Sequence, residues 1–443
     1  MAGNWSRFAG AAWGVFLAAI YPLLAIAPLV IIAVLHPRSD HLRAAEVGVD
    51  CAAVGYTILL LQFVITARFR WIEAPFGLDV LMVFHRAMAL VATTLLCVHP
   101  FLVPWGEGGW LLTRWHVDWY IWAGRATLAL LLVQAAAGLS RRVMRIPYER
   151  WRRIHNLVAP VVLALGFAHA VAAGDDLSGG GLLVWAAMTG IALACWLFGR
   201  VVRPWLLMRH AFRVIAVERE APHVWTLSLR TPTNRPFHFA PGQFQFLRLH
   251  GAQIPADDHP FTIASSPTEP GRIRLTIKES GDFTSMIGRV RPGDRATVHG
   301  PFGRFSHTLH ADDQDLVFVA AGVGITPLMS MLRYMRDRRQ PRRVLLVYAS
   351  HSLADVVFAD ELAAIEACGT PKLKVVHVLA NAPPGWTGET GRLDADRLAS
   401  LCGGVARKSF YICCPPPMMA ALVRGLGHSG VSARRIHADV FSI

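Results

Sequence analysis

Four histidines lie inside long apolar segments of the chain, and their spacing repeats. His85 and His99 are fourteen residues apart in one segment, and His155 and His169 are fourteen residues apart in another. Helical residues advance by about 100° and 1.5 Å each, so the two members of a pair share a helix face and lie about 21 Å apart along the axis. An ionisable side chain within a membrane is costly and marks a functional position. The repeat therefore indicates that these four imidazoles share one function.

The two histidine segments are the third and fifth of six apolar segments, so they run in the same direction. His85 therefore lies at the depth of His155, and His99 lies at the depth of His169. Neutral imidazole binds iron well, and coordination offsets the cost of burying it. Hydrogen-bonding or proton-relay histidines are the alternative, but that role does not require equal spacing on parallel segments. The pattern predicts two stacked b-type haems with these four histidines as axial ligands.

The elements that must hold these histidines are membrane-spanning helices. The chain has 443 residues and is 53% hydrophobic and only 17% charged, which is too apolar for an ordinary soluble protein. The first apolar run is too long for the core of a signal peptide, so we expect it to be retained as a span. Windows long enough to cross a hydrocarbon core of about 30 Å fall near residues 11–35, 47–67, 78–104, 119–139, 154–173 and 181–199.

The charges of the loops predict how the spans are oriented. The segments 67–70 and 140–153 are basic, whereas the segment 174–176 is acidic. Basic loops stay in the cytoplasm, so an even number of spans places both termini there. We therefore expect an integral protein of the cell (plasma or inner) membrane. The His85–His155 pair is expected near the cytoplasmic side and the His99–His169 pair near the outer side.

The formal net charge of +14 does not indicate nucleic-acid binding. The arginines gather in a loop between two apolar runs, and no basic stripe with interleaved aromatic residues occurs in the soluble half. The seven cysteines include no C-x-x-C pair, so neither a disulfide framework nor a zinc site is predicted. The arginines of that loop are Arg141, Arg142, Arg145, Arg150, Arg152 and Arg153.

From about residue 211 the sequence changes to soluble α/β character. Short alternating segments separated by Pro and Gly predict a small antiparallel β-barrel. After Asp315, buried strands alternate with helical sequence, and the first strand is followed by a glycine turn and a helix, which is typical of a doubly wound nucleotide-binding domain. We predict three domains: a six-helix transmembrane di-haem bundle over residues 1–205, an antiparallel barrel over 210–310 and an α/β domain over 315–443.

The segment HPFTIASSP, residues 259–267, resembles the flavin-binding signature of the NADPH oxidase and ferric reductase superfamily. The six spans, this segment and the C-terminal domain occur in the family's order, so the resemblance covers nearly the whole chain. It implies that the barrel binds FAD, with Thr262 near the polar edge of the isoalloxazine and the segment GDFTSMI, residues 281–287, on the pyrophosphate. The implied FAD contacts are His259, Pro260, Phe261, Thr262, Lys278, Gly281, Phe283 and Thr284.

The segment AAGVGITPL, residues 320–328, follows a buried strand and opens a helix. Glycines at 322 and 324 let the backbone approach a pyrophosphate closely. The resemblance adds the segment YICCPPPMM, residues 411–419, in which Cys413 takes the place beside the nicotinamide, although Cys414 replaces the family's glycine. A buried apolar cysteine is the structural alternative. The implied NADPH or NADH contacts are Gly322, Gly324, Thr326, Pro327, Cys413 and Pro415.

Two positions leave part of the nucleotide chemistry open. Many NADPH-using relatives have an arginine after the strand where this chain has His351, and histidine is mostly neutral at pH 7, so NADPH and NADH stay alternatives. Relatives also place a C-terminal aromatic ring on the flavin face where the nicotinamide stacks. Phe441 is the only aromatic residue near that end, so we expect it to stack there, with a core phenylalanine as the alternative.

The resemblance implies an NAD(P)H-dependent flavocytochrome oxidoreductase that passes electrons through FAD and two haems to an acceptor outside the membrane. A ferric chelate is the favoured acceptor. Dioxygen, as in a superoxide-producing oxidase, and a quinone or partner protein are alternatives, whereas a transporter would not need the four histidines. Arg86 and Arg125 are candidates for haem propionates or for interfacial arginines that contact water. The outer-loop histidines, which could meet an incoming metal or solvent, are His36, His41 and His116.

Overall fold

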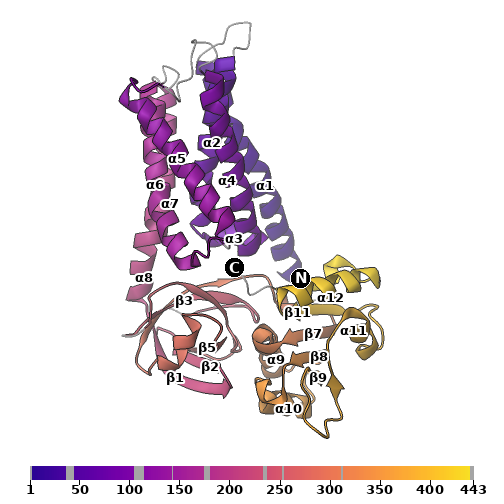
Figure 1. The fold of residues 1–443 in the computed structure, drawn as a ribbon. Helices are drawn as coiled ribbons and strands as arrows, with labels where there is room; N and C mark the ends of the chain where they lie inside the picture. Colours follow the sequence, from indigo (N-terminus) through magenta and orange to yellow (C-terminus); the bar gives the residue numbers. More distant parts are fainter. Residues whose placement is uncertain are drawn as a thin grey trace. The chain divides into compact units, whose positions relative to one another are not determined.

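The computed structural model describes residues 2–35, 44–103, 114–141, 143–173, 180–232, 237–251, 254–310 and 313–439. The chain divides into two compact units, Met1–Pro204 and Trp205–Ile443, which are coloured along the sequence in Figure 1. Phe441, His36 and His41 lie outside the described residues.

The first unit is a bundle of long helices. Six helical segments of the described chain are long and apolar enough to cross a membrane, as the hydrophobic windows predict. A short helix, α3 (Arg70–Phe76), follows α2, and α7 continues through a π-helical turn at Phe198–Val202 into α8 (Arg203–Arg209). The long helices are α1 (Ala2–Leu35), α2 (Ala44–Thr66), α4 (Leu78–Leu102), α5 (Trp119–Ser140), α6 (Tyr148–Ala173) and α7 (Gly180–Leu197).

Small residues bring helices α2 and α4 into close contact. A Cβ atom built on Gly48 would lie 2.9 Å from the Val103 side chain, and one on Gly55 would lie 3.0 Å from Leu96 and 3.1 Å from the Ala92 carbonyl oxygen. In lipid, where apolar side chains gain little by leaving the solvent, helices associate through such close backbone approach. The two glycines therefore place α2 directly beside the helix that carries His85 and His99.

A buried tyrosine connects three helices of the bundle. The Tyr56 hydroxyl donates to the Leu163 carbonyl oxygen at 3.0 Å and lies 3.1 Å from the Thr189 hydroxyl. These contacts join α2 to α6 and α7, so a polar group inside the bundle is satisfied by protein partners, as burial requires.

The barrel in the second unit is a six-stranded sheet with the order β4-β3-β6-β1-β2-β5. All its pairings are antiparallel, as predicted. The Ala264 N–H donates to the Arg274 carbonyl oxygen at 2.8 Å, which joins the segment after β4 to β5 at the other end of the strand order. The strands are β1 (Phe212–Ala221), β2 (Val224–Arg230), β3 (Phe244–His250), β4 (His259–Thr262), β5 (Arg272–Lys278) and β6 (Arg295–Phe302).

The second sheet of this unit is parallel, with the order β10-β9-β8-β7-β11-β12. Its strand order reverses between β7 and β11, and ligands bind at such a switch point in doubly wound folds. The strands are β7 (Asp315–Ala321), β8 (Arg343–Ser350), β9 (Lys372–Leu379), β10 (Glu389–Thr390), β11 (Ser409–Cys413) and β12 (Ile436–Ala438). The helices are α9 (Ile325–Asp337), α10 (Ala359–Cys368), α11 (Ala395–Leu401) and α12 (Pro416–His428).

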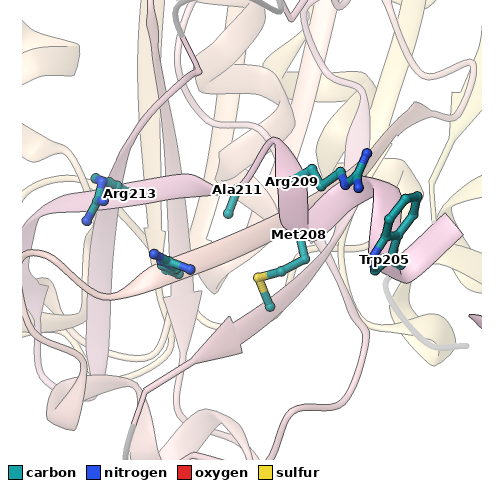
Figure 2. Close-up of a pocket in the computed structure, with 6 residues that line it drawn as sticks. Trp205, Met208, Arg209, Ala211 and Arg213 are labelled. Carbon is teal, nitrogen blue, oxygen red and sulfur yellow. The ribbon is translucent and has the colours of Figure 1, made fainter. Parts of the chain in front are cut away.

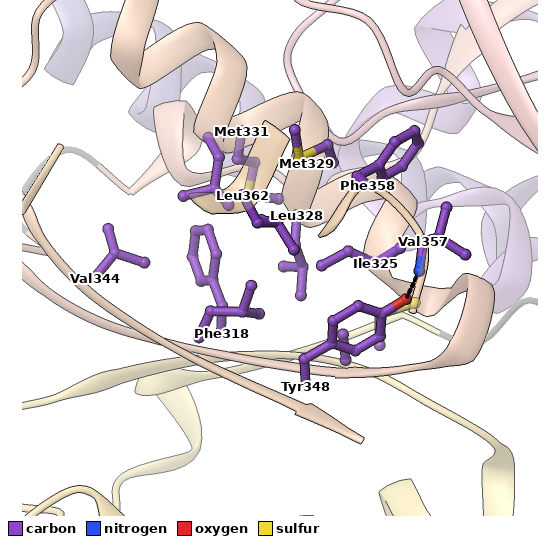
Figure 3. Packing of buried hydrophobic residues seen from close by; sticks show 14 of the residues in the cluster. Phe318, Ile325, Leu328, Met329, Met331, Val344, Tyr348, Val357, Phe358 and Leu362 are labelled. Carbon is purple, nitrogen blue, oxygen red and sulfur yellow. Dashed lines mark hydrogen bonds between the residues drawn. The ribbon is translucent and has the colours of Figure 1, made fainter. Parts of the chain in front are cut away.

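Helices cover both faces of this sheet, because its central strands are apolar on both sides. Phe318 packs into a buried cluster with residues of α9 and α10 (Figure 3), whereas its neighbours Val317 and Val319 pack against α11 and α12. Successive strand side chains point to opposite faces, so one continuous apolar strand supplies both cores. The prediction of a doubly wound α/β fold is confirmed, whereas the exact boundaries 1–205, 210–310 and 315–443 stay predictions.

Candidate functional site

The four membrane histidines come together in two pairs across helices α4 and α6. The ring centres of His85 and His155 lie 6.3 Å apart with planes inclined at 76°. The ring centres of His99 and His169 lie 6.2 Å apart at 75°. The structure therefore joins each histidine to the partner at its own depth, in the same arrangement at both depths.

These separations fit one metal ion held between the two rings of each pair. A histidine nitrogen binds a transition metal at about 2 Å and the ring centre lies ~1.1 Å behind it, so rings sharing a metal have centres roughly 6 Å apart. In the part of the chain that the structure describes, no group of three or more His, Cys, Asp or Glu side chains could hold a metal. Two histidines at each level are the donor set that a bis-histidine haem requires.

The Nδ1 atom of every histidine in the two pairs has an oxygen partner. In the inner pair, His85 lies 3.0 Å from Gln62 Oε1, and His155 lies 3.1 Å from Gln134 Oε1. Each Nδ1 can donate a proton to an oxygen acceptor, which leaves the Nε2 lone pair of that ring free to bind a metal.

In the outer pair, the acceptors are backbone carbonyl oxygens. His99 Nδ1 lies 3.0 Å from the Gly48 oxygen, and His169 Nδ1 lies 2.8 Å from the Tyr120 oxygen. Gln62 and Gln134, the acceptors in the inner pair, were not identified from the sequence, because a single polar residue in a span gives no periodic signal. Their position one helix away from a histidine becomes visible only in the packed bundle.

Gly124 on α5 makes room for the His169 ring. A Cβ atom at this position would lie 2.9 Å from both Cε1 and Nδ1 of His169, closer than atoms in real structures approach. The absence of a side chain at Gly124 therefore positions the outer ligand against α5.

Gly124→Ala is expected to reduce the occupancy of the outer haem to well below one per chain, because the added methyl group pushes the His169 ring off its position. The measurement is the haem-to-protein ratio of the purified protein. The matched control is Gly190→Ala in α7, where a Cβ meets nothing within 4 Å. Equal haem content in the two variants would contradict this role.

Arg86 and Arg125, the candidates for haem propionates, and the outer-loop His116 have different surroundings. Arg86 is exposed on α4 and His116 is exposed before α5. The Arg125 guanidinium donates to the Arg114 carbonyl oxygen at 2.6 Å and lies over the Trp122 ring at 4.6 Å. The structure thus gives Arg125 protein partners, and no role toward a haem is assigned to it.

The two flavin motifs meet in the barrel. The rings of His259 on β4 and Phe283 in the 281–287 segment stack with centres 3.9 Å apart, and Phe261 lies 6.2 Å from Phe283. The Thr262 hydroxyl is buried and has no hydrogen-bond partner among the described residues. A buried polar atom without a partner is costly, so this hydroxyl fits a contact to the polar edge of a bound flavin.

The other predicted flavin contacts have mixed surroundings. The Thr284 hydroxyl accepts from the backbone N–H groups of Ser280 and Gly281 at 2.8 and 2.9 Å, so it holds the turn itself. Lys278 and Gly281 are exposed at the end of β5 and in this turn, and Pro260 is half-buried within β4. The Thr284 hydroxyl and the N–H groups of Ser280 and Gly281 therefore bind one another within the turn.

The two nucleotide motifs meet at the switch point of the parallel sheet. A Cβ atom on Gly324 would lie 2.2 Å from the Cys413 carbonyl oxygen and 3.4 Å from its Sγ atom. Gly322 adopts a left-handed conformation with φ of +53°, which favours glycine. Only glycine therefore allows the 320–328 turn to pass so close to the end of β11.

Tyr348 on β8 stabilises this turn through a hydrogen bond. Its hydroxyl donates to the Gly322 carbonyl oxygen at 3.0 Å and accepts the Val357 N–H at 3.2 Å, the bond drawn in Figure 3. Burial raises the pKa of Tyr348 to about 12, so the phenol stays protonated and remains a donor. This residue was not identified from the sequence, because its partner is a backbone atom on another segment.

The remaining nucleotide residues occupy the same turn and the start of α12. The Thr326 hydroxyl donates to the Val323 carbonyl oxygen at 3.0 Å, Pro327 is buried, and Pro415 is exposed before α12. Burial raises the pKa of the fully buried Cys413 thiol well above its usual range. The thiol is therefore neutral at pH 7, which does not favour Cys413 as a nucleophile.

Cys414, where the family has glycine, is buried in a core cluster and lies outside the left-handed region of φ. Burial raises the pKa of its thiol to about 11. Glycine's conformational freedom is thus not needed at this position, and the departure does not distort the end of β11.

The flavin-binding segment is also tied to helix α9. The Arg333 side chain is 1% exposed and donates to the Ala264 carbonyl oxygen at 2.6 Å, while the Ser330 hydroxyl donates to the Ser265 carbonyl oxygen at 2.7 Å. Arg333 also pairs with Glu361 through two bonds at 2.8 and 2.5 Å. A paired, buried arginine is a rigid connection, so α9 fixes the backbone that follows Thr262.

His351 lies directly after β8, exposed, with Nε2 3.0 Å from the Asn381 side-chain nitrogen. His351→Arg is expected to shift the ratio of kcat/KM values toward NADPH by about tenfold, since a permanent cation there would face the 2′-phosphate. The measurement is steady-state turnover with each nucleotide. The control is His351→Gln, which adds no charge, and an unchanged ratio in His351→Arg would show that this position does not read the phosphate.

Comparison with known proteins identifies three segments. Residues 51–166 match the family described as ferric reductase like transmembrane component, residues 209–294 match an FAD-binding domain, and residues 318–424 match an oxidoreductase NAD-binding domain. The first match contains His85, His99 and His155 and ends three residues before His169, the second contains the stacked flavin motifs, and the third contains the glycine turn.

Similar curated proteins are named as reductases or reductase subunits. The stachydrine N-demethylase reductase subunit Stc4 of Rhizobium meliloti is 30% identical over 50% of this chain and 64% of its own length. The glycine betaine monooxygenase reductase subunit of Pseudomonas aeruginosa is 28% identical over 54% and 65%. Ferredoxin–NADP reductase B of Sorangium cellulosum is 29% identical over 51% and 95%. The chain thus spans about two thirds of the length of the first two relatives.

Two solved structures resemble the chain. The Amycolatopsis cytochrome P450 reductase GcoB has a TM-score of 0.47 and 24% identity, and covers 53% of this chain and 70% of its own. Flavohemoglobin from Malassezia yamatoensis, with bound FAD and haem, has a TM-score of 0.49 and 18% identity, and covers 90% and 98%.

Proposed function

We propose that this chain transfers electrons across the membrane through two haems to an outer one-electron acceptor. The chain is a membrane-bound NAD(P)H- and FAD-dependent oxidoreductase with the domain architecture of the ferric reductase and NADPH oxidase superfamily. The observation that carries this proposal is the pair of histidine sites, each with ring centres about 6 Å apart and with every Nδ1 atom held by an oxygen. An enzyme that kept its electrons on one side of the membrane would not need two such sites.

The bound cofactors would supply the redox chemistry: a hydride from the nicotinamide, its division into single electrons by the flavin, and one-electron transfer by haem iron. The residues of this chain orient those groups. The glycine turn at Gly322 and Gly324, held by Tyr348, would bind the nucleotide pyrophosphate, and Cys413 would limit the position of the nicotinamide. The partnerless Thr262 hydroxyl would bind the polar edge of the flavin.

The histidine pairs determine what kind of acceptor the protein can use. The two histidines of each pair would hold a haem iron between them, which would leave no ligand position open to a substrate. An acceptor would therefore take its electron from outside the coordination sphere, as a ferric chelate, dioxygen or a quinone can. We favour a ferric chelate as the acceptor. In this proposal the basic segment 140–153 and both termini lie in the cytoplasm.

A second candidate is a redox subunit that passes electrons to a partner protein. The relatives named as reductase subunits of stachydrine N-demethylase and glycine betaine monooxygenase favour it, because a reductase subunit supplies electrons to another component.

The test uses the full chain in sealed vesicles with its cytoplasmic side outward, so that NADH or NADPH can be added from the medium. A ferric chelate, or cytochrome c with and without superoxide dismutase, is enclosed inside, and a quinone is tested in the membrane. Reduction of the enclosed chelate supports the favoured function, and dismutase-sensitive reduction of cytochrome c supports the oxidase. Purified protein without a haem Soret band would contradict transmembrane transfer through haems.

A further inference from the structure

The inner histidine pair differs from the outer pair in one respect: its Nδ1 acceptors are side chains, whereas those of the outer pair are backbone oxygens. A backbone acceptor is the same for any residue type, but a side-chain acceptor can be changed or polarised by its own neighbours. The inner pair therefore has an adjustable partner that the outer pair lacks.

The orientation of the Gln62 amide follows from its other contacts. Gln62 is 4% exposed, and its Nε2 atom lies 3.1 Å from the Ile58 carbonyl oxygen and 2.8 Å from the Tyr21 hydroxyl. A carbonyl oxygen can only accept, so the amide nitrogen must face Ile58 and the amide oxygen must face His85. This places a continuous hydrogen-bonded series from Tyr21 on α1 through Gln62 on α2 to His85 on α4.

We propose that Gln62, polarised by Tyr21, is a positioning residue that sets the electron density of His85 and thereby lowers the midpoint potential of the inner haem. The inference rests on the proposed function, because it needs a haem at that pair. An imidazole that donates from Nδ1 to an acceptor is a stronger electron donor at Nε2, which stabilises oxidised iron. An amide whose N–H groups are already donating is a better acceptor, because hydrogen bonds in a series strengthen one another. Helix α1 carries none of the predicted haem ligands, but through Tyr21 it thus affects the midpoint potential of the inner haem.

The test is a spectroscopic redox titration of the purified full chain in the wild type and three variants. Gln62→Met keeps the length of the side chain but has no acceptor, so the inner midpoint is expected to rise by about 59 mV, a tenfold change in the one-electron equilibrium. Tyr21→Phe is expected to raise it by less. The outer midpoint stays constant in both. Tyr56→Phe is the matched control, because Tyr56 is also a buried span tyrosine but contacts no histidine of either pair.

Haem content separates failure of this inference from failure of the proposed function. A wild type without haem would contradict the function itself. Two haems whose midpoints are the same in Gln62→Met as in the wild type would overturn the inference, as would equal shifts of both midpoints or a shift in Tyr56→Phe. Repeating Gln62→Met in a His99→Ala background leaves one haem to titrate, so the shift can be assigned to the inner site.

A different observation carries a second inference, which concerns a basic pocket in the second unit. The pocket has a volume of about 430 Å³, and Figure 2 shows the side chains around it. Three arginines from three elements line it: Arg209 at the end of α8, Arg213 on β1 and Arg295 on β6. Arg213 and Arg295 are paired across neighbouring strands. The remaining lining residues are Trp205, Met208 and Ala211.

The charges in this pocket are not neutralised by the protein. Among the described residues, no carboxylate forms an ion pair with these three exposed arginines; Arg209 contacts the Trp205 ring, 3.6 Å from its centre. The carboxylate nearest in sequence, Asp294, accepts the Arg291 N–H at 2.9 Å. Three guanidinium groups around one cavity match a phosphate, which they can bind with paired hydrogen bonds.

Helix α8 supplies three of the lining residues, Trp205, Met208 and Arg209, and its position indicates the source of the phosphate. Trp205 and Arg209 end the sixth candidate span, Gly181–Arg209. Tryptophans and arginines at the end of a span lie at the level of the lipid headgroups. We infer that this pocket binds the phosphate of an anionic lipid headgroup at the end of the sixth span.

The test compares lipid retention by the full chain after purification from bilayers of phosphatidylcholine with and without phosphatidylglycerol. The wild type is expected to retain phosphatidylglycerol selectively, counted per chain by mass spectrometry. The variant R209Q/R213Q/R295Q is expected to bind it roughly 100-fold more weakly. The control R145Q/R150Q/R153Q removes the same charge from three exposed arginines, one before α6 and two within its first two turns, and is expected to retain the lipid.

Three outcomes would overturn the inference. Equal loss in the two triple variants would show attraction by net charge alone. Full displacement of the lipid by inorganic phosphate at the same concentration would show a site for soluble phosphate. Loss of FAD from the pocket variant, with lipid retained, would assign the three arginines to the flavin site.

Discussion

Replacing either outer histidine should remove one haem and leave the flavin reducible. His99→Ala and His169→Ala each remove one of two axial ligands, and a single remaining imidazole does not hold a bis-histidine haem. The haem-to-protein ratio is therefore expected to fall from about two to about one per chain. The inner pair lies on other turns of the same helices and keeps its own acceptors, Gln62 and Gln134.

The measurement combines haem content with anaerobic flavin reduction. NAD(P)H should bleach the flavin band in both variants at the wild-type rate, while transfer to an outer acceptor falls at least 100-fold because the last step lacks its site. For the haem-to-protein ratio, the matched control is His116→Ala, which removes an exposed histidine close in sequence to α5 that belongs to neither pair. Two haems per chain in both variants would show that these residues are not the ligands.

The second large effect is expected for Gly324→Ala at the switch point of the parallel sheet. Its new Cβ atom would lie 2.2 Å from the Cys413 carbonyl oxygen and 2.9 Å from the carbonyl carbon. These are backbone atoms of a fully buried strand end, so neither can move aside cheaply. The turn must shift, and a displacement of about 1 Å is expected to lower kcat/KM for the nicotinamide about 100-fold.

Stopped-flow reduction of the flavin measures this step directly. Haem content and reduction of the haems by dithionite should be unchanged, because the altered turn lies in the second unit. Gly427→Ala in α12 is the matched control, since its Cβ meets nothing within 4 Å. A variant that binds and oxidises NAD(P)H as the wild type does would mean that the turn does not place the nucleotide.

Local sequence patterns could predict the spans, the parallel direction of α4 and α6, and the succession of an antiparallel barrel and a doubly wound domain along the chain. Each depends on a period or a motif within one segment. The spacing of fourteen between His85 and His99 is a property of one helix, so it predicts a shared face without reference to the rest of the bundle. The glycine turn at 320–328 is likewise a local motif, and Gly322 adopts a φ of +53°, which favours glycine.

Tertiary structure decided which groups act on those residues. Gln62, Gln134 and Gly124 lie on helices next to the histidines they contact, and Tyr348 reaches Gly322 from another strand. Each of these contacts depends on the rotation and register of two packed elements, which no period within either element contains. A histidine in a span can be recognised from the sequence because its burial in lipid is costly. Its hydrogen-bond acceptor cannot, because a glutamine or a backbone carbonyl is identified as the acceptor only once the helices pack. For that reason the sequence alone determined where the four histidines are, and only the packed bundle determined how they are held.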